Sequence, residues 1–307
     1  MASSPLTFAL VSRRRLVGLA FGAMHSARRG IGSDIAGSRP YRPGDDVDTI
    51  DWAASAKLSA ARAQDEFVVR ERHAEEAPYV VCVCDRRPEM AHMAPPLPWL
   101  SKPAAMRAAM ALIYQATGDA RGFVGHLDHA DGATFWRPPT SERNAREIAT
   151  SRAELDRFEA PSDTLALAFA HLAEHRRVLP AGSFVFLLSD FLQAPRDEEW
   201  LRALEHRWDI VPVVIQDPIW EQSFPEVDGL AFPFGDARTG RVTYVRLTAE
   251  EATELRERNE LRLRELLDRL RGLGLEPILL SSADPDHVLV SFARWTEQRL
   301  VERGRGW

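Results

Sequence analysis

The chain has 307 residues, of which 45% are hydrophobic and 27% are charged, a composition typical of globular proteins with a packed core and unlike that of disordered chains. Its formal net charge of -6 argues against a general nucleic-acid-binding protein, because binding to phosphate groups needs a basic surface. The longest apolar stretches are shorter than the roughly 20 residues that span a bilayer, so no transmembrane helix is expected.

The N-terminal part of the chain is basic at first and then acidic. Residues 1–42 hold seven arginines and one acid, whereas residues 43–78 hold nine acids and four Lys or Arg residues. We expect residues 1–17 to form a solvated basic arm. Any membrane contact of this arm would be peripheral, because each basic residue near anionic lipid contributes only about 1 kcal/mol and no amphipathic face accompanies the charge.

From residue 79 onward, apolar runs alternate with helical patterns. The apolar runs predict six strands, over residues 79–85, 122–129, 133–137, 183–190, 210–216 and 275–280. Capping residues and helical periodicity predict six helices, over residues 101–118, 141–158, 163–177, 197–207 and 248–272, with a closing helix from residue 284. The turn-rich residues 218–247 predict a hairpin insertion.

This alternation predicts the fold class. Continuous apolar strands separated by helices of ten or more residues indicate parallel strands that are covered on both faces. We therefore expect an α/β protein with an open, doubly wound, mostly parallel sheet. In such sheets ligands bind at the carboxyl ends of the strands, near the switch point of the strand order.

Three oxygen-bearing side chains stand near predicted strand ends. Asp85 and Asp190 follow two apolar strands, and Thr164 opens a helix. Together they could bind one hard cation such as Mg²⁺. The alternative is structural, since an Asp after a strand often forms a turn and a Ser, Asp or Thr often caps a helix.

The sequence gives little support to an enzyme. It contains no glycine-rich phosphate loop, no nucleophile elbow and no zinc-protease motif of the H-E-x-x-H type. His126 and His129 stand beside Asp128 and Asp131 near a strand end, and we expect them to be exposed loop residues rather than an acid–base or metal cluster. No catalytic residue is assigned, and an enzyme of unknown reaction remains an alternative.

Two cysteines, Cys82 and Cys84, are the only ones in the chain and lie two residues apart in a predicted buried strand. They would point to the same face, where they would not normally bridge. The absence of a disulfide framework favours a reducing compartment, and we expect a cytoplasmic protein.

A dense motif precedes the first buried strand. It consists of nine residues at fixed spacing, namely Arg39, Tyr41, Arg42, Pro43, Gly44, Asp45, Asp46, Asp51 and Trp52. This motif resembles the signature of the bacterial family called domain of unknown function 58, and the resemblance extends over about residues 18–281. We expect ion pairs of Arg39 and Arg42 with the acids of this segment, and apolar anchoring by Tyr41 and Trp52. A calcium loop is not expected, because the twelve-residue ligand spacing is missing.

The resemblance implies a domain organisation. It implies a signature segment over residues 18–78 and a domain similar to the von Willebrand factor type A fold over residues 79–307. Because the signature segment begins near residue 18, we expect the signal-like residues 13–27 to be retained rather than cleaved.

The resemblance also implies the place of a metal-ion-dependent adhesion site. On the family pattern, Asp85, Thr164 and Asp190 match its ligands, whereas the two expected serines are replaced by Arg87 and Glu89. A guanidinium repels a cation and pairs well with carboxylates. We therefore expect a degenerate site in which Arg87 takes the place of Mg²⁺. In the alternative, Glu89 supplies a ligand oxygen and the metal binds.

The function implied by the resemblance is that of a non-catalytic, protein-binding adaptor. The family is associated with MoxR-type AAA+ ATPases in chaperone-like maturation or activation of other proteins, and the client here is not named by the sequence. Arg86, Arg87 and Glu89 would then contact the partner. An alternative is a membrane-surface scaffold anchored by the basic N-terminus.

Overall fold

The computed structural model describes residues 7–12, 35–41, 50–62, 64, 66–72, 77–91, 100–131, 133–140 and 157–305. These residues belong to two compact units. The larger unit comprises residues 1–15 and 78–307, and the smaller unit comprises residues 16–77. The boundary after Ala77 is therefore close to the expected one. Within the described residues, none of the helices has the length and apolar character needed to span a membrane.

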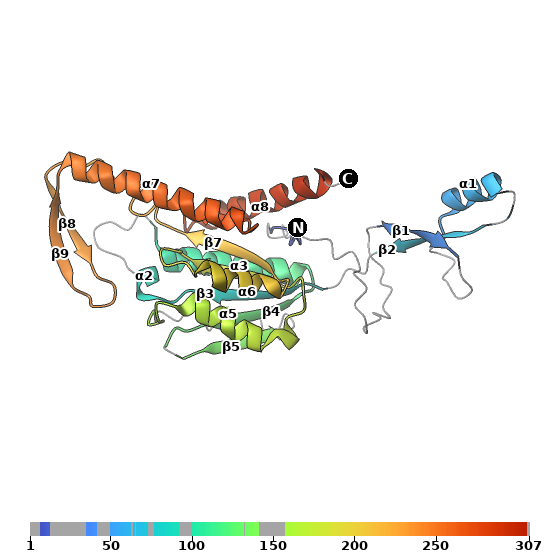
Figure 1. The fold of residues 1–307 in the computed structure, drawn as a ribbon, viewed down its shortest axis with the longest axis horizontal. Coiled ribbons are helices and arrows are strands. Elements are labelled where there is room, and N and C mark those ends of the chain that lie inside the picture. Colours follow the sequence, from blue (N-terminus) through green and yellow to red (C-terminus); the bar gives the residue numbers. More distant parts are fainter. Residues whose placement is uncertain are drawn as a thin grey trace, which may run out of the picture. The chain divides into compact units, whose positions relative to one another are not determined.

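A six-stranded sheet forms the centre of the larger unit (Figure 1). Its strands lie in the order β10-β7-β6-β3-β4-β5, and all neighbours are parallel except β5, which runs antiparallel to β4. The bounds are β3 Tyr79–Cys84, β4 Phe123–Asp128, β5 Phe135–Thr140, β6 Phe184–Ser189, β7 Asp209–Ile215 and β10 Ile278–Leu280. The predicted α/β class with a mostly parallel, doubly wound sheet is confirmed.

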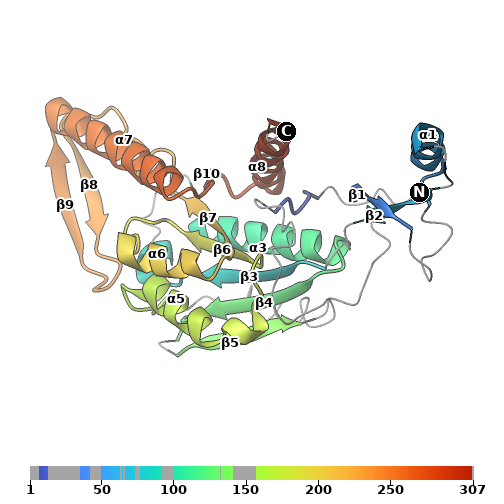
Figure 2. The same ribbon diagram turned by 45° about the vertical axis from the view of Figure 1, so that its right-hand side comes forward.

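Helices cover both faces of this sheet (Figure 2). One face is covered by α3 (Lys102–Asp119) and α8 (Pro285–Arg305), and the other by α5 (Thr164–Glu174), α6 (Asp197–Glu205) and part of α7 (Ala249–Gly272). Strand β3 serves both layers, because Cys82 packs on the α3 side and Val83 on the α5 side. This alternation follows from the two-residue period of a strand and explains why the strand is apolar throughout.

The N-terminal caps predicted for α3 and α7 are present in the structure. The Ser101 hydroxyl accepts a hydrogen bond from the backbone N–H of Ala104 at the start of α3. Thr248 and Glu251 form the predicted capping box at the start of α7. The predicted helix over residues 141–158 lies outside the described residues as far as residue 156, and residues 157 and 158 are not helical.

Residues 7–12 are packed rather than solvated, which corrects the expected solvated arm over residues 1–17 for these six residues; the rest of the arm lies outside the described residues. Phe8 is 5% exposed and lies 4.8 Å from the ring of Phe292 on α8. The hydroxyl of Thr296 donates to the carbonyl of Ala9. These contacts make the segment part of the core under α8. Burial of apolar side chains such as Phe8 stabilises this packing.

The predicted insertion is a hairpin of β8 (Leu230–Gly235) and β9 (Val242–Leu247). It stands beside the N-terminal end of α7, away from the central sheet (Figures 1 and 2). Phe232 and Leu247 pack with Trp220 and Phe224 in a small apolar cluster. A lone two-stranded hairpin is marginally stable in water, so this cluster fixes it to the domain.

The smaller unit contains β1 (Ile35–Pro40), α1 (Trp52–Arg62) and β2 (Val68–Arg72), with β1 antiparallel to β2. Asp51 caps α1, because its carboxylate accepts from the backbone N–H of Ala54. Tyr41 and Trp52 both pack edge-on against Phe67, at 6.4 and 6.0 Å between ring centroids.

Most of the acidic signature motif lies outside the described residues. This holds for Arg42, Pro43, Gly44, Asp45 and Asp46, whereas Arg39 lies in β1. Their ion pairs stay a prediction. Trp52 is 60% exposed in this unit, and its expected role as an anchor to the larger domain also stays a prediction.

Candidate functional site

The candidate site lies where the strand order changes direction, at the carboxyl ends of β3 and β6. Asp85 follows β3 and Asp190 follows β6, and the two strands are neighbours in the sheet. The Asp85 backbone N–H donates to the carbonyl of Leu188, which continues the ladder beyond the strand. Both aspartates are fully buried. The expectation that these residues share one edge is therefore met by the fold.

Arg87 lies between the two carboxylates. Its Nε is 3.0 and 2.9 Å from the carboxylate oxygens of Asp85, and its Nη2 is 2.6 Å from Asp85 Oδ2. The same Nη2 donates to Asp190 Oδ1 at 2.8 Å. The Ser189 hydroxyl donates to Asp85 Oδ2 at 2.6 Å. One guanidinium thus joins both strand ends through buried, charge-assisted hydrogen bonds, the stronger kind of hydrogen bond in proteins.

A lysine and a glutamate extend this network. Lys102 Nζ at the start of α3 lies 3.0 Å from Asp190 Oδ2 and 2.6 Å from Glu221 Oε1. Two cations therefore face three carboxylates, those of Asp85, Asp190 and Glu221. We call these five residues the strand-edge ion network.

The loop after β7 holds the network in place. Gln216 donates from its side-chain amide to the carbonyl of Asp190 at 2.6 Å. The backbone N–H of Asp217 donates to Glu221 Oε2 at 2.8 Å, and the Asp217 carboxylate accepts from the backbone N–H of Leu100 at 2.8 Å. Segments that precede α3 and follow β6 and β7 are thereby joined at one place.

Burial and the neighbouring charges shift the pKa values of Arg87, Lys102 and Glu221. Burial opposes charge on Arg87, but its hydrogen bonds to Asp85 and the charges of Asp85 and Asp190 outweigh burial and raise its pKa. The pKa of Lys102 is also raised, because the charges of Asp190 and Glu221 outweigh the cost of burial. Burial raises the pKa of Glu221, with Lys102 acting against it. Arg87 and Lys102 therefore stay cationic at neutral pH.

A divalent cation does not fit among these side chains as they lie. Its place between Asp85 and Asp190 holds the Arg87 guanidinium, and the second oxygen of Asp190 is bonded to Lys102. A metal ion there would stand next to two fixed positive charges inside a buried site, where Coulomb repulsion is weakly screened.

Thr164 and Glu89, which the sequence suggested as metal ligands, do not belong to the strand-edge ion network. The Thr164 hydroxyl pairs with the ring of His129 at 3.2 Å. Glu89 pairs with Arg238 in the turn of the β8–β9 hairpin at 2.8 Å. This pair ties the tip of the hairpin to α2 (Pro88–Ala91) beside the strand edge. Glu89 thus acts as a contact of the hairpin in this structure and not as a substitute ligand.

The expected contact of Arg86 and Arg87 with a partner needs correction. Arg86 is 2% exposed, and its guanidinium lies 5.0 Å from the ring centroid of Phe158. Arg87 is fully buried in the strand-edge ion network. Neither side chain is open to a docking protein. Among the three residues assigned to partner binding, Glu89 alone is partly exposed.

The expected exposure of the histidine cluster was also wrong. His126 and Asp128 are fully buried in β4, and their side chains pair at 2.7 Å. The other ring nitrogen of His126 pairs with the hydroxyl of Tyr114 on α3 at 2.7 Å. Burial lowers the pKa of His129. These residues form a satisfied polar chain inside the core.

Three residues of this site, Lys102, Ser189 and Glu221, were not predicted from the sequence. Ser189 could have been found, because it precedes Asp190 at the end of the most apolar strand. Lys102 follows a capping serine, and Glu221 stands in a turn-rich stretch. Lys102 and Glu221 are 119 positions apart in the sequence, so no local sequence pattern indicates that they pair.

Together the fold and the site define a class: an α/β protein with a doubly wound, mostly parallel sheet whose switch-point edge is closed by buried ion pairs. Residues 37–265 match the model of the family described as protein of unknown function DUF58. The chain belongs to this family, as its signature motif indicated.

Known relatives and structures are similar to the chain at low identity. Uncharacterized proteins of Mycobacterium bovis and Mycobacterium tuberculosis are 23% identical over 296 residues, which cover 93% of this chain and 86% of each relative. The conserved hypothetical protein BatB of Bacteroides thetaiotaomicron is 14% identical with a TM-score of 0.42, covering 75% of this chain and 100% of that one. An aerotolerance-related membrane protein of Bacteroides fragilis is 14% identical with a TM-score of 0.42, covering 72% and 99%.

Proposed function

We propose that this chain is a non-catalytic adaptor that binds other proteins and acts with a MoxR-type AAA+ ATPase in the maturation or activation of a client protein. The partner is the one that the family resemblance implies, and the proposal places both in the cytoplasm, where ATP is available. The observation that supports the proposal most is an exposed apolar hairpin fixed beside a closed strand edge.

The β8–β9 hairpin exposes several large apolar side chains. Tyr244 is 73% exposed, Val242 54%, Leu230 56% and Phe234 42%. These side chains lie on both faces of the two-stranded sheet, because cross-strand neighbours such as Pro233 and Tyr244 share one face and Phe232 and Val245 share the other. Exposed apolar side chains gathered on one element often mark a protein interaction site.

The strand edge supports a role in binding rather than in chemistry. The aspartates at the switch point are neutralised by Arg87 and Lys102, so they are not poised as an acid–base pair or as metal ligands. The Glu89–Arg238 ion pair connects this rigid edge to the hairpin turn. In this proposal the strand edge holds the hairpin in position, and the hairpin provides the surface that contacts the partner.

The proposal predicts that a charge on the hairpin disrupts capture of the ATPase. Aromatic residues at the centre of interfaces contribute about 2 kcal/mol or more, which is roughly a 30-fold change in affinity. We expect Tyr244→Asp to weaken binding of the purified MoxR-type ATPase of the same organism by about that factor, measured by biolayer interferometry. Because Tyr244 is 73% exposed, the variant should fold normally.

The matched control is Leu261→Asp, which places the same charge at a 49% exposed apolar position on α7, outside the hairpin. The control should bind like the unaltered chain. Failure of the unaltered chain to bind the ATPase would contradict the proposed partnership. Equal binding by Tyr244→Asp and the unaltered chain would contradict the hairpin as the contact surface.

A further inference from the structure

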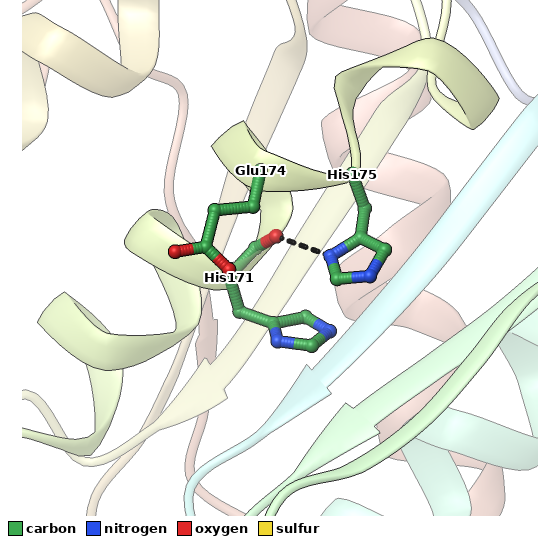
Figure 3. Close-up of side chains that lie close together, drawn as sticks. All are labelled: His171, Glu174 and His175. Atoms are coloured by element: carbon green, nitrogen blue, oxygen red, sulfur yellow. Dashed lines mark hydrogen bonds between the residues drawn. The ribbon is translucent and has the colours of Figure 1, made fainter.

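The end of α5 brings two imidazoles and a carboxylate to one side of the larger unit. His171, Glu174 and His175 occupy positions i, i+3 and i+4, which face the same way on a helix. Their potential ligand atoms all lie within 4.8 Å of one another. Figure 3 shows the two rings one above the other with the carboxylate of Glu174 beside them. These residues form the sequence spacing His-x-x-Glu-His within a segment predicted to be helical.

The ring of His175 is held in one tautomer. Its Nδ1 lies 2.9 Å from the backbone carbonyl oxygen of His171, as the dashed line in Figure 3 marks. A carbonyl only accepts, so Nδ1 carries the proton and Nε2 is left with a lone pair. Metal-binding histidines are commonly oriented in this way, with one ring nitrogen donating to a backbone carbonyl and the other free to coordinate.

The ring of His171 is held by packing. It stacks on the ring of His175 with 4.2 Å between centroids, and Trp136 of β5 contacts both rings at 5.4 and 5.7 Å. Next to it, Leu172 is fully buried in the core and fixes the helix. The Nε2 atom of His171 is buried and has no hydrogen-bond partner among the described residues. A buried polar atom of this kind points to a missing ligand or water.

We propose that His171, Glu174 and His175 bind a divalent transition-metal ion of the Zn²⁺ type. Two imidazoles and one carboxylate are the ligands that Zn²⁺ takes in proteins, whereas Mg²⁺ and Ca²⁺ require oxygen ligands. Two nitrogens on one tetrahedral zinc lie roughly 3.4 Å apart, so small side-chain rotations close the site. Three protein ligands leave a coordination position open, and Glu174 and His175 are exposed. A carboxylate or imidazole of a partner could complete the coordination.

The test uses the full chain freed of metal by chelation and then titrated with Zn²⁺ by isothermal titration calorimetry. We expect binding of one Zn²⁺ that is weakened at least tenfold by His175→Ala, with a similar loss for Glu174→Gln. Since both residues are exposed, neither variant depends on repacking the core. The matched control is His287→Ala, which removes an exposed histidine on α8 and should leave binding unchanged.

A second readout separates this site from the cysteines. Co²⁺ bound by two imidazoles and a carboxylate should give weak visible absorption without the strong near-ultraviolet band of a thiolate ligand. A thiolate band would place the metal at Cys82 or Cys84 and overturn the proposal. So would equal Zn²⁺ affinity in the unaltered chain and in His175→Ala. Neither result depends on the ATPase, so failure here and failure of the proposed function are distinguishable.

Discussion

Replacement of Arg87 by methionine is expected to lower the free energy of unfolding by about 3 to 5 kcal/mol, the range found when one partner of a buried ion pair is removed. Methionine retains much of the side-chain length but cannot neutralise Asp85 or Asp190, which are both fully buried. Lys102 would still pair with Asp190 and Glu221, whereas Asp85 would have lost its ion pair with Arg87. Urea denaturation of the purified variant measures the change.

Two further variants separate lost charge pairing from lost packing. Removing the carboxylate charges as well, in Arg87→Met with Asp85→Asn and Asp190→Asn, should recover part of the stability, because the variant no longer buries unpaired charges. Arg202→Met, which alters an exposed arginine on α6, should change stability by less than about 0.5 kcal/mol. A loss below about 1 kcal/mol for Arg87→Met would show that the network contributes little to stability.

Replacement of Arg299 by methionine is expected to lower the free energy of unfolding by a similar amount, about 3 to 5 kcal/mol. Arg299 on α8 is 3% exposed and donates to both oxygens of Asp209 at 2.8 Å. It also donates to the carbonyl of Val11 at 2.7 Å, pairs with Glu276 and stacks on Trp295. Its loss removes the two charge-assisted hydrogen bonds to the buried Asp209 carboxylate and one hydrogen bond to the N-terminal segment.

This variant should also loosen residues 7–12 selectively. Hydrogen exchange of these residues should become faster by a larger factor than that of β3 or β6, since the hydrogen bond from Arg299 to the Val11 carbonyl is removed. Arg294→Met is the matched control, because Arg294 is exposed on the same helix. Unchanged exchange of residues 7–12 in Arg299→Met would contradict the assignment of the N-terminal segment to this core.

The sequence predicts the parts of the fold that depend on local patterns. Strands such as 79–84 and 184–189 are apolar throughout because helices cover both faces, and that signature is visible without a structure. The proximity of Asp85 and Asp190 also follows from the sequence, because residues after parallel strands meet at one edge of the sheet. The family resemblance predicted that Arg87 would pair with the neighbouring carboxylates, and Arg87 forms these ion pairs with Asp85 and Asp190.

Other parts depend on contacts that no local pattern encodes. Glu221 reaches Lys102 only because the loop after β7 folds over the start of α3. His126 was expected at the surface, yet it shares the inner face of β4 with Val124 and is satisfied by Tyr114 and Asp128. His126 stands two residues after Val124, so on a strand both side chains point to the same face. The prediction of an exposed His126 relied on its polarity and did not use this spacing.

We propose that Arg87, which lies between the Asp85 and Asp190 carboxylates, occupies the place where a cation would bind, so that this strand edge works without a metal. Isothermal titration of the unaltered chain with Mg²⁺ tests it most directly, with Asp190→Asn as the companion variant. The account predicts no Mg²⁺ binding by the unaltered chain, because its carboxylates are already paired with Arg87 and Lys102. Binding of one Mg²⁺ that Asp190→Asn abolishes would contradict the account and return the metal to this edge.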